Sequence, residues 1–446
     1  MKRLLILALA LLLAGTARAE TVIKLSHFFG VCEAEFGRNL DLEKANGECP
    51  MLTTLVNRFN DQHRGRWRVQ MQVMEHSSYY PQLGARLVSR DVPAISIMHA
   101  SQLNDFVKRG LVEPLGPAFA ATGIDANDFT PHARSGAWRA EAFYALPADS
   151  HAWLWHFNTR LMAKAGLLDA RGEPLVPHRP AELLDHARRF KAATGKPYLA
   201  WMTSNDTAFF GRTLINLVAQ QGASLFPESP LKIDLQSPAV KEALRLFRAL
   251  EREGLTTRDM DYSAAVQAFM NGQVGMMING TWLLGPLNAQ ARTPGTPLFE
   301  AYRAIPFPQL YARPAAWADS HEWVMFKGGT RTADEQAAAW AFLKHWHDHD
   351  VYWARTGQLP ARMSSLKSAA YLDLPQRRAI APVAEIGVAL PPTVARQFRV
   401  IASMGELFND LVVGGGDEAV ELPKVQTTLT RMLTREAQFI AEGKKP

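Results

Sequence analysis

Residues 268–282 read AFMNGQVGMMINGTW, and this stretch decides the fold. Apolar residues at helical spacing lead up to Asn271-Gly272, which ends a helix because both residues tolerate positive φ. The apolar run Val274–Ile278 is long enough for one buried strand. A second Asn-Gly pair then leads to Trp282. The stretch therefore predicts a large flat ring just beyond the carboxyl end of a strand, where open α/β sheets bind ligands.

At 446 residues the chain is too long for one hydrophobic core, so two domains are expected. Strand-like and helix-like patterns alternate near the beginning of the chain. The expected strands are 21–25, 68–74 and 94–98, and the expected helices are 50–63, 79–89 and 101–109. This order predicts an α/β fold with a mostly parallel sheet. Further helices are expected at 180–193, from Pro238 behind a Ser237 cap, and at 333–347.

Five segments, from about residue 23 to residue 364, resemble one family in the same order. The stretch 268–282 has the spacing F-x-x-G-x-x-x-M-x-x-x-G-x-W, and residues 79–115 have the family's first-lobe pattern ending in G-L-x-x-P-L. Residues 143–158 and 158–167 are similar to its first hinge and the following A-G-L segment, with Phe157 where Tyr is usual. Residues 356–364, TGQLPARMS, are similar to its late T-G-x-L-P-x-R segment. The chain thus resembles the maltose-binding type of extracellular solute-binding proteins of ABC importers, family 1.

The resemblance implies a two-lobed periplasmic binding protein fold of type II. Its lobes are discontinuous in sequence and are joined by hinge strands. The expected N-terminal lobe comprises residues 20–147 and 280–327, and the expected C-terminal lobe comprises residues 148–279 and 328–446.

The first 19 residues have the pattern of a cleaved signal peptide. Lys2 and Arg3 precede a short apolar run, and small residues lead to an expected cut after Ala19. Removal of this segment, with its three basic residues, takes the formal net charge from +6 to +3. No basic block with interleaved aromatics appears, so a nucleic-acid partner is not expected. The sequence predicts an exported, periplasmic protein.

Cys32 and Cys49 are the only cysteines. Two cysteines this close in an oxidising compartment predict a disulfide that pins a polar insertion, Glu33–Glu48. A metal site on these thiolates would need further cysteines or nearby paired histidines, which the sequence lacks.

A sugar offers apolar C–H faces and a rim of hydroxyls, so its site needs flat aromatic rings and fixed polar groups. Trp282 is the foremost candidate for a stacking ring, followed by Trp201. Trp153 and Trp155 alternate on the expected crossover strand and share one face, so one of them can be a core residue. Gly280 belongs to the same motif as Trp282.

Polar candidates lie where expected strands end: His27, Glu75, His76, His99, Asp149, Ser150 and Arg362. A denser group, Trp317-Ala318-Asp319-Ser320-His321-Glu322-Trp323, precedes an apolar strand. Here a carboxylate can accept charge-assisted hydrogen bonds from hydroxyls. The predicted ligand-binding residues are therefore Trp282, Trp201, Trp317, Asp319, His321, Glu75, His76, Asp149, Trp155, Gly280, Arg362 and His27. The segment Trp317–Trp323 departs from the glycine-rich stretch that is usual in the family at this point.

The segment His345–Asp350, HWHDHD, invites a metal interpretation because His345 and His349 would share one helix face. The family pattern makes this an outer helix with a solvated polar face. No metal and no cofactor are therefore predicted.

The predicted function is the periplasmic binding component of an ABC importer. It would capture a carbohydrate as its lobes close and deliver it to the membrane permease, acting as a monomer. An alternative keeps the binding role with a glycerol phosphate ester or another polyol as ligand. A carbohydrate-active enzyme with paired carboxylates is the third hypothesis. No nucleophile, zinc or phosphate-loop motif supports an enzyme, and no catalytic residue is assigned.

Overall fold

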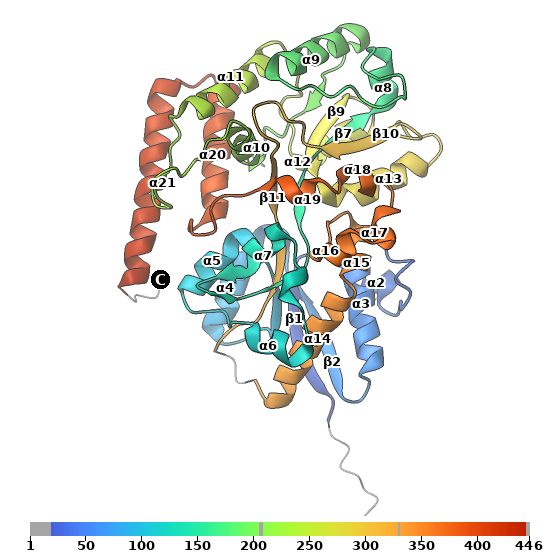
Figure 1. Ribbon diagram of the computed structural model, residues 1–446, viewed down its shortest axis with the longest axis vertical. Helices are drawn as coiled ribbons and strands as arrows, with labels where there is room; N and C mark the ends of the chain where they lie inside the picture. Colours follow the sequence, from blue (N-terminus) through green and yellow to red (C-terminus); the bar gives the residue numbers. More distant parts are fainter. Residues whose placement is uncertain (1–18, 205–207, 329–330, 443–446) are drawn as a thin grey trace, which may run out of the picture. The chain divides into compact units, whose positions relative to one another are not determined.

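The computed structural model describes residues 19–204, 208–328 and 331–442 (Figure 1). The predicted signal peptide lies outside these residues, apart from its last position. The chain divides into two compact units, each described here by itself. The first contains the described residues up to Ser96 together with Gly328–Asp348, and the second contains Ile97–Lys327 and the chain from His349 onward. The predicted lobes divide the chain elsewhere, and their boundaries remain a prediction.

The first unit is built on parallel strands. β1 (Thr21–His27) pairs with β2 (Trp67–Val73) along its whole length, and Leu25 and Ser26 pair with the beginning of β3 (Ile95–His99). The helices are α2 (Glu33–Phe36), α3 (Glu48–Gln62), α4 (Tyr79–Ser89) and α14 (Ala333–Asp348), with the 3-10 turn η1 (His76–Ser78). Helices α3 and α14 pack on the strands through apolar faces, with the Phe59 and Phe342 rings 5.4 Å apart.

The second unit contains a mixed sheet with the order β13-β11-β7-β9-β8, to which β10 adds by pairing with β7. Its strands are β7 (His151–Asn158), β8 (Leu199–Ala200), β9 (Met276–Gly280), β10 (Tyr302–Pro306), β11 (Ala316–Asp319) and β13 (Gly387–Val388). Strand β7 is antiparallel to β9, β10 and β11. Nearby, β12 (His321–Val324) pairs with β6 (Leu146–Pro147), and β4 (Trp138–Arg139) pairs with β5 (Ala142–Phe143).

Helices complete the second unit. The longer ones are α5 (Ala100–Lys108), α9 (Pro180–Thr194), α10 (Ala208–Gln220), α11 (Pro238–Arg252), α12 (Tyr262–Met270), α13 (Leu284–Arg292), α20 (Gln397–Val412) and α21 (Glu418–Ala441). The shorter ones are α6 (Gly116–Thr122), α7 (Pro131–Ala137), α8 (Thr159–Lys164), α15 (Asp350–Trp353), α16 (Met363–Leu366), α17 (Ala369–Leu372), α18 (Arg377–Ile380) and α19 (Val383–Ile386). The 3-10 turns are η2 (Ala126–Asp128), η3 (Thr281–Leu283) and η4 (Ala354–Thr356).

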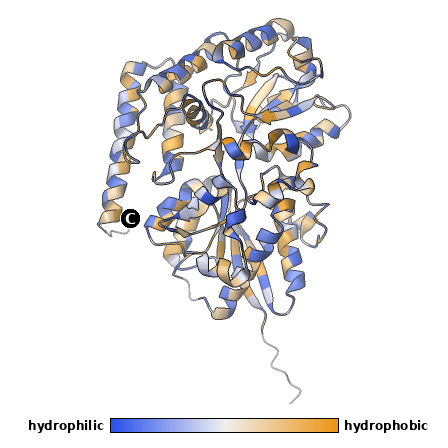
Figure 2. Ribbon diagram, in the orientation of Figure 1, coloured by the Kyte–Doolittle hydropathy of each residue, from blue (hydrophilic) through white to orange (hydrophobic). Residues whose placement is uncertain are grey.

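The core of the second unit lies between its sheet and the helices α10, α11 and α20, which pack on one another (Figure 1). Helix α21 alternates hydrophobic and hydrophilic residues along its length (Figure 2), and it buries Leu422, Leu429 and Leu433. Such a face stabilises a surface helix mainly through packing. Within the described ranges, no helix combines the length and the hydropathy needed to cross a membrane.

Most of the expected elements are confirmed within one or two residues. The helix, break, strand and Trp282 of the deciding stretch appear as α12, Asn271-Gly272, β9 and η3, and Ser237 caps α11 through the Val240 N–H. The expectation for His345–Asp350 is wrong in two respects. Helix α14 ends at Asp348, so His345 and His349 do not share a helix face. His345 and His347 are also buried rather than on a solvated face.

Cys32 and Cys49 form the predicted disulfide, with Cα atoms 6.0 Å apart. It joins the residue before α2 to the first turn of α3. The enclosed insertion is mostly exposed and anchors itself through Leu42 and Ala45. A segment with so little apolar burial depends on a cross-link for its order.

Replacement of both cysteines, Cys32→Ser with Cys49→Ser, should lower the free energy of unfolding by roughly 3 kcal/mol, because the unfolded chain regains the entropy of an open loop. Urea denaturation measures the loss. The wild-type protein under reducing conditions should lose the same amount, and an unchanged unfolding midpoint would contradict a stabilising role for the bridge.

Candidate ligand-binding site

The candidate site is built around the beginning of β7. This strand is buried along its whole length, and its neighbours bring other segments to its first residues. Trp153 lies opposite Gly280 at the end of β9, and His151 lies opposite Asp319 at the end of β11. Three distant parts of the sequence therefore end together at one edge of the sheet.

Three tryptophans meet at this edge. The Trp153 ring lies 5.0 Å from the Trp317 ring and 5.7 Å from the Trp282 ring, measured between centroids. Trp282 is the half-buried member, and its indole N–H donates to the Tyr262 hydroxyl at 2.8 Å. The ring lies directly against Gly280, where a Cβ would come within 2.0 Å of it. Glycine at this position is therefore required by the placement of Trp282.

Arg212, from α10, brings a positive charge to the same rings. Its guanidinium carbon lies 4.9 Å from the Trp317 ring centroid and 5.7 Å from that of Trp153. Such stacking holds the planar group in place. Among the described residues, the buried Nε of Arg212 has no hydrogen-bond partner.

Beside the tryptophans, Asp149 collects donors from separate segments. Its Oδ2 accepts hydrogen bonds from the Trp353 indole at 2.7 Å and pairs with His321 Nδ1 at 2.8 Å, and its Oδ1 accepts the His321 backbone N–H at 3.1 Å. His151 Nδ1 lies 3.5 Å from the same Oδ1. The side chain of Asp149 is completely buried.

Asp319 anchors the beginning of α5 to this cluster. It accepts hydrogen bonds from the Ser101 backbone N–H at 3.2 Å and from the Ser101 hydroxyl, and its negative charge suits a helix N-terminus. The preceding residue of the chain, Ala100, donates its N–H to the Ser320 carbonyl. His99 is thereby placed with its ring centroid 5.0 Å from that of His321.

Burial dominates the electrostatics of the cluster. It would by itself raise the pKa of Asp149, but the His321 and His151 rings hold that pKa below its usual value. Burial, helped by the neighbouring His321 ring, lowers the pKa of His151. Burial also raises the pKa of Glu322 well above its usual value, although the Ser320 hydroxyl donates to this carboxyl. The site thus places a carboxylate with a lowered pKa, Asp149, beside two groups whose neutral forms are favoured by burial, His151 and Glu322.

Six of the predicted site residues come together here: Trp282, Gly280, Trp317, Asp319, His321 and Asp149. Trp155 lies farther along β7, buried against Phe307. Trp201 is buried against Phe209, Phe210 and Phe247 in the core. Ligand contact by Trp155 or Trp201 remains a prediction that their apolar surroundings do not favour.

His27, Glu75 and His76 lie in the first unit. His27 is buried at the end of β1, and burial lowers its pKa to about 4. Glu75 caps η1 by accepting the Ser78 N–H, and the His76 ring packs edge-on against Phe28. These contacts give each residue a local role, and ligand binding by them stays a prediction.

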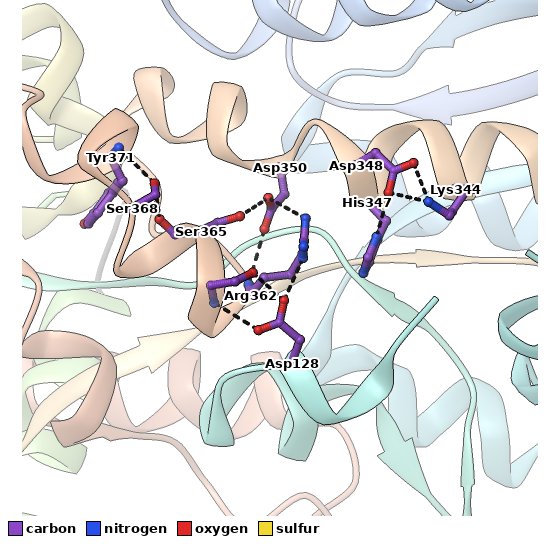
Figure 3. Close-up of polar contacts among 10 residues, drawn as sticks. Asp128, Lys344, His347, Asp348, Asp350, Arg362, Ser365, Ser368 and Tyr371 are labelled. Atoms are coloured by element: carbon purple, nitrogen blue, oxygen red, sulfur yellow. Dashed lines mark hydrogen bonds and ion pairs between the residues drawn. The ribbon is translucent and has the colours of Figure 1, made fainter. Parts of the chain in front are cut away.

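Arg362 is already engaged with carboxylates (Figure 3). Its Nε donates to Asp128 at 2.9 Å, and its Nη1 lies 3.7 Å from Asp350, whose carboxyl also accepts the Ser365 hydroxyl. Asp128 further accepts the Ser364 N–H. The network holds the chain around α16 in place, and a ligand would have to compete with it for Arg362.

The buried carboxyl of Asp350 makes stability depend on pH. Burial raises its pKa to about 6, although Ser365 and Arg362 favour the ionised form. Because the Asp350 pKa is higher in the folded state, this carboxyl contributes to the free energy of unfolding most fully below its unfolded pKa near 3.8. That contribution is lost as the pH rises through the folded-state pKa of about 6. The free energy of unfolding relative to Asp350→Asn should therefore fall by about 2 kcal/mol between pH 4 and pH 7. Denaturation series of both proteins test this, and a pH-independent difference would contradict it.

Sequence reasoning did not select His151 or Arg212. His151 had a usable signal, since it follows Asp149 by two residues at the start of an aromatic strand. Arg212 had none, because it is one of many basic residues on predicted helices. Its position over two tryptophans arises only from the packing of α10 on β11.

Comparison with known families identifies the class. Residues 54–379 match the bacterial extracellular solute-binding proteins, and because the match spans most of the chain, the protein belongs to this family. The recognition made from the sequence motifs is thereby confirmed at the level of extracellular solute binding. A sequence search of curated proteins finds no match.

Solved structures confirm the fold. The GacH receptor of Streptomyces glaucescens GLA.O has a TM-score of 0.76 at 18% identity and covers 94% of this chain and 99% of its own. The sugar-binding protein MalE of Xanthomonas citri has a TM-score of 0.76 at 18% identity, over 95% and 100%. UgpB of Mycobacterium tuberculosis, solved with glycerophosphocholine, has a TM-score of 0.74 at 17% identity, and the match covers 94% of this chain and 100% of UgpB. The chain therefore has the two-lobed α/β fold of MalE-like binding proteins.

Proposed function

We propose that this solute-binding protein captures a carbohydrate and delivers it to the permease of an ABC importer. The observation that carries the proposal is the group Trp153, Trp282 and Trp317 beside buried carboxylates. Tryptophan faces match the apolar faces of sugar rings, and fixed carboxylates accept hydrogen bonds from hydroxyls. GacH, solved with acarbose, and the sugar-binding protein MalE share the fold and add support.

Trp282 is the ring best placed to meet a solute. Trp153 and Trp317 are almost completely buried behind it, whereas Trp282 keeps an exposed portion. Its orientation is set by Gly280 below and by the Tyr262 hydroxyl. A ring held in this way loses little further freedom when it binds a ligand.

Arg212 supports the alternative ligand, a glycerol phosphate ester. Its guanidinium is held over Trp317, and the buried Nε has no hydrogen-bond partner among the described residues. A fixed guanidinium is well suited to a phosphate group. UgpB, solved with glycerophosphocholine, is the neighbour that fits this alternative.

The role is one of binding and transport rather than catalysis. The family consists of solute-binding proteins, and the buried carboxylates Asp149 and Asp319 are occupied by protein donors. Export to the periplasm, the monomeric state and closure of the predicted lobes over the solute belong to this proposal. A bound sugar should be recovered unchanged after incubation.

A thermal-shift screen of the mature protein tests the ligand class. The screen covers mono-, di- and oligosaccharides, polyols and glycerol phosphate esters. A solute that binds only the folded state should add about 2.7 kcal/mol of stability at a hundredfold excess over Kd. A shift with a neutral sugar supports the main proposal, and a shift with phosphate esters alone supports the alternative. No shift with any of these compounds would contradict both.

Trp282→Ala should weaken binding of the solute found in that screen at least tenfold, because it removes the exposed stacking face. Calorimetric titration measures the affinity. Because the ring is only half-buried, its removal should lower thermal stability little. Trp138→Ala, at an exposed position on β4, is the matched control and should leave affinity unchanged. Unchanged affinity with a large loss of stability would make Trp282 a core residue.

A further inference from the structure

Three histidines from distant segments converge next to the tryptophans. His99 ends β3, His151 begins β7 and His321 begins β12. One ring nitrogen from each lies within 4.8 Å of the others. The ring centroids are 4.5 Å apart for His151 and His321, 5.0 Å for His99 and His321, and 5.9 Å for His99 and His151. All three side chains are buried.

Asp149 lies beside two of these rings, on the Nδ1 side of each. Its carboxylate pairs with Nδ1 of His321 at 2.8 Å and lies 3.5 Å from Nδ1 of His151. A carboxylate beside Nδ1 favours the tautomer of a neutral ring that carries its proton on Nδ1. Histidines that bind metals commonly have such a carboxylate behind them. The Trp353 indole N–H holds the carboxylate itself in place.

We propose that His99, His151 and His321 form a binding site for a divalent transition-metal ion, with zinc as the best-matched ion. Nε2 of His151 and His321 and one ring nitrogen of His99 are the ligands, and Asp149 is the carboxylate behind them. Three protein nitrogens leave a fourth tetrahedral position for an oxygen donor. Tetrahedral Zn–N bonds of about 2.0–2.1 Å place nitrogens about 3.3 Å apart, so the rings must close in by up to about 1.5 Å on binding.

Charge favours a cation at this place. Within the described chain, the ionisable side chains that contact the Asp149 carboxylate are those of His151 and His321, and no lysine or arginine pairs with it. Asp319 lies close by, two residues before His321 and opposite His151 in the sheet. A buried carboxylate without a lysine or arginine partner is compensated when a divalent ion binds between the rings beside it.

The site extends the solute-binding function without depending on the identity of the solute. His151 contacts both Trp282 and Trp317, with ring centroids 5.6 and 6.0 Å apart, so the metal would lie next to the proposed stacking ring. The metal interpretations weighed from the sequence concerned Cys32 with Cys49 and the segment His345–Asp350, and neither led to a predicted metal site. Nothing in the sequence brings residues 99, 151 and 321 together.

The test uses the full mature protein without an affinity tag, freed of metal by chelation. Calorimetric titration with Zn²⁺ should show about one saturable site, and Mg²⁺ should show none. Co²⁺ should give the visible absorption bands of a tetrahedral nitrogen site. His151→Gln and His321→Gln should each weaken Zn²⁺ binding at least tenfold. His178→Gln, at an exposed histidine outside the cluster, should leave it unchanged.

A measurement on the wild-type protein guards against variants that fail to fold. In spectra of isotopically labelled histidine, Zn²⁺ should shift the ring resonances of His99, His151 and His321 and leave that of His178 in place. Absence of saturable Zn²⁺ binding would overturn the proposal. So would stoichiometric binding that persists in folded His151→Gln, or shifts confined to the histidines of residues 345–349. Sugar binding that survives without metal would leave the proposed function intact.

Discussion

The buried carboxylate of Asp149 is the constraint on which the candidate site depends. A charge that is fully removed from water is tolerated only when hydrogen bonds and opposite partial charges surround it. Here the donors come from the backbone and ring of His321 and from the indole of Trp353. Satisfying one carboxylate therefore ties the start of β12 and the end of α15 to the segment before β7.

Strand β7 supplies the second constraint. Because it is buried on both faces and paired on both edges, its side chains have no freedom to adjust. His151 and Trp153 are consequently held at fixed heights beside the ends of β9 and β11. The segment around Leu359 is joined to the residue before β7 by an antiparallel backbone bridge between Ser150 and Leu359. A rigid backing of this kind lets a half-exposed ring such as Trp282 present a defined surface to a solute.

The local sequence pattern was sufficient to predict most helices and strands, because the spacing of apolar residues indicates the type of element and the break residues mark where it ends. The stretch before Trp282 placed α12, β9 and the ring beyond them, and Ser237 marked the start of α11. The polar tail of α14 was misjudged because burial depends on what packs against a helix. His345 donates its ring Nε2–H to the Leu55 carbonyl of α3, a partner that lies far away in sequence. Trp201 is likewise a residue type that suits sugar binding, but its burial depends on the phenylalanines that pack against it in the core.

The sequence by itself determined the family, the α/β class, the disulfide and the chain segments that end at the site, since motif spacing and periodicity are local properties. It also selected Asp149, Trp282, Trp317, Asp319 and His321, which lie in strands or within two residues of a strand end. Only the tertiary structure decided that His99 and His151 join His321 in one cluster and that Arg212 covers two tryptophans. Those groupings arise from strand pairing and helix packing between residues far apart in the chain, and single-sequence patterns carry no record of such contacts.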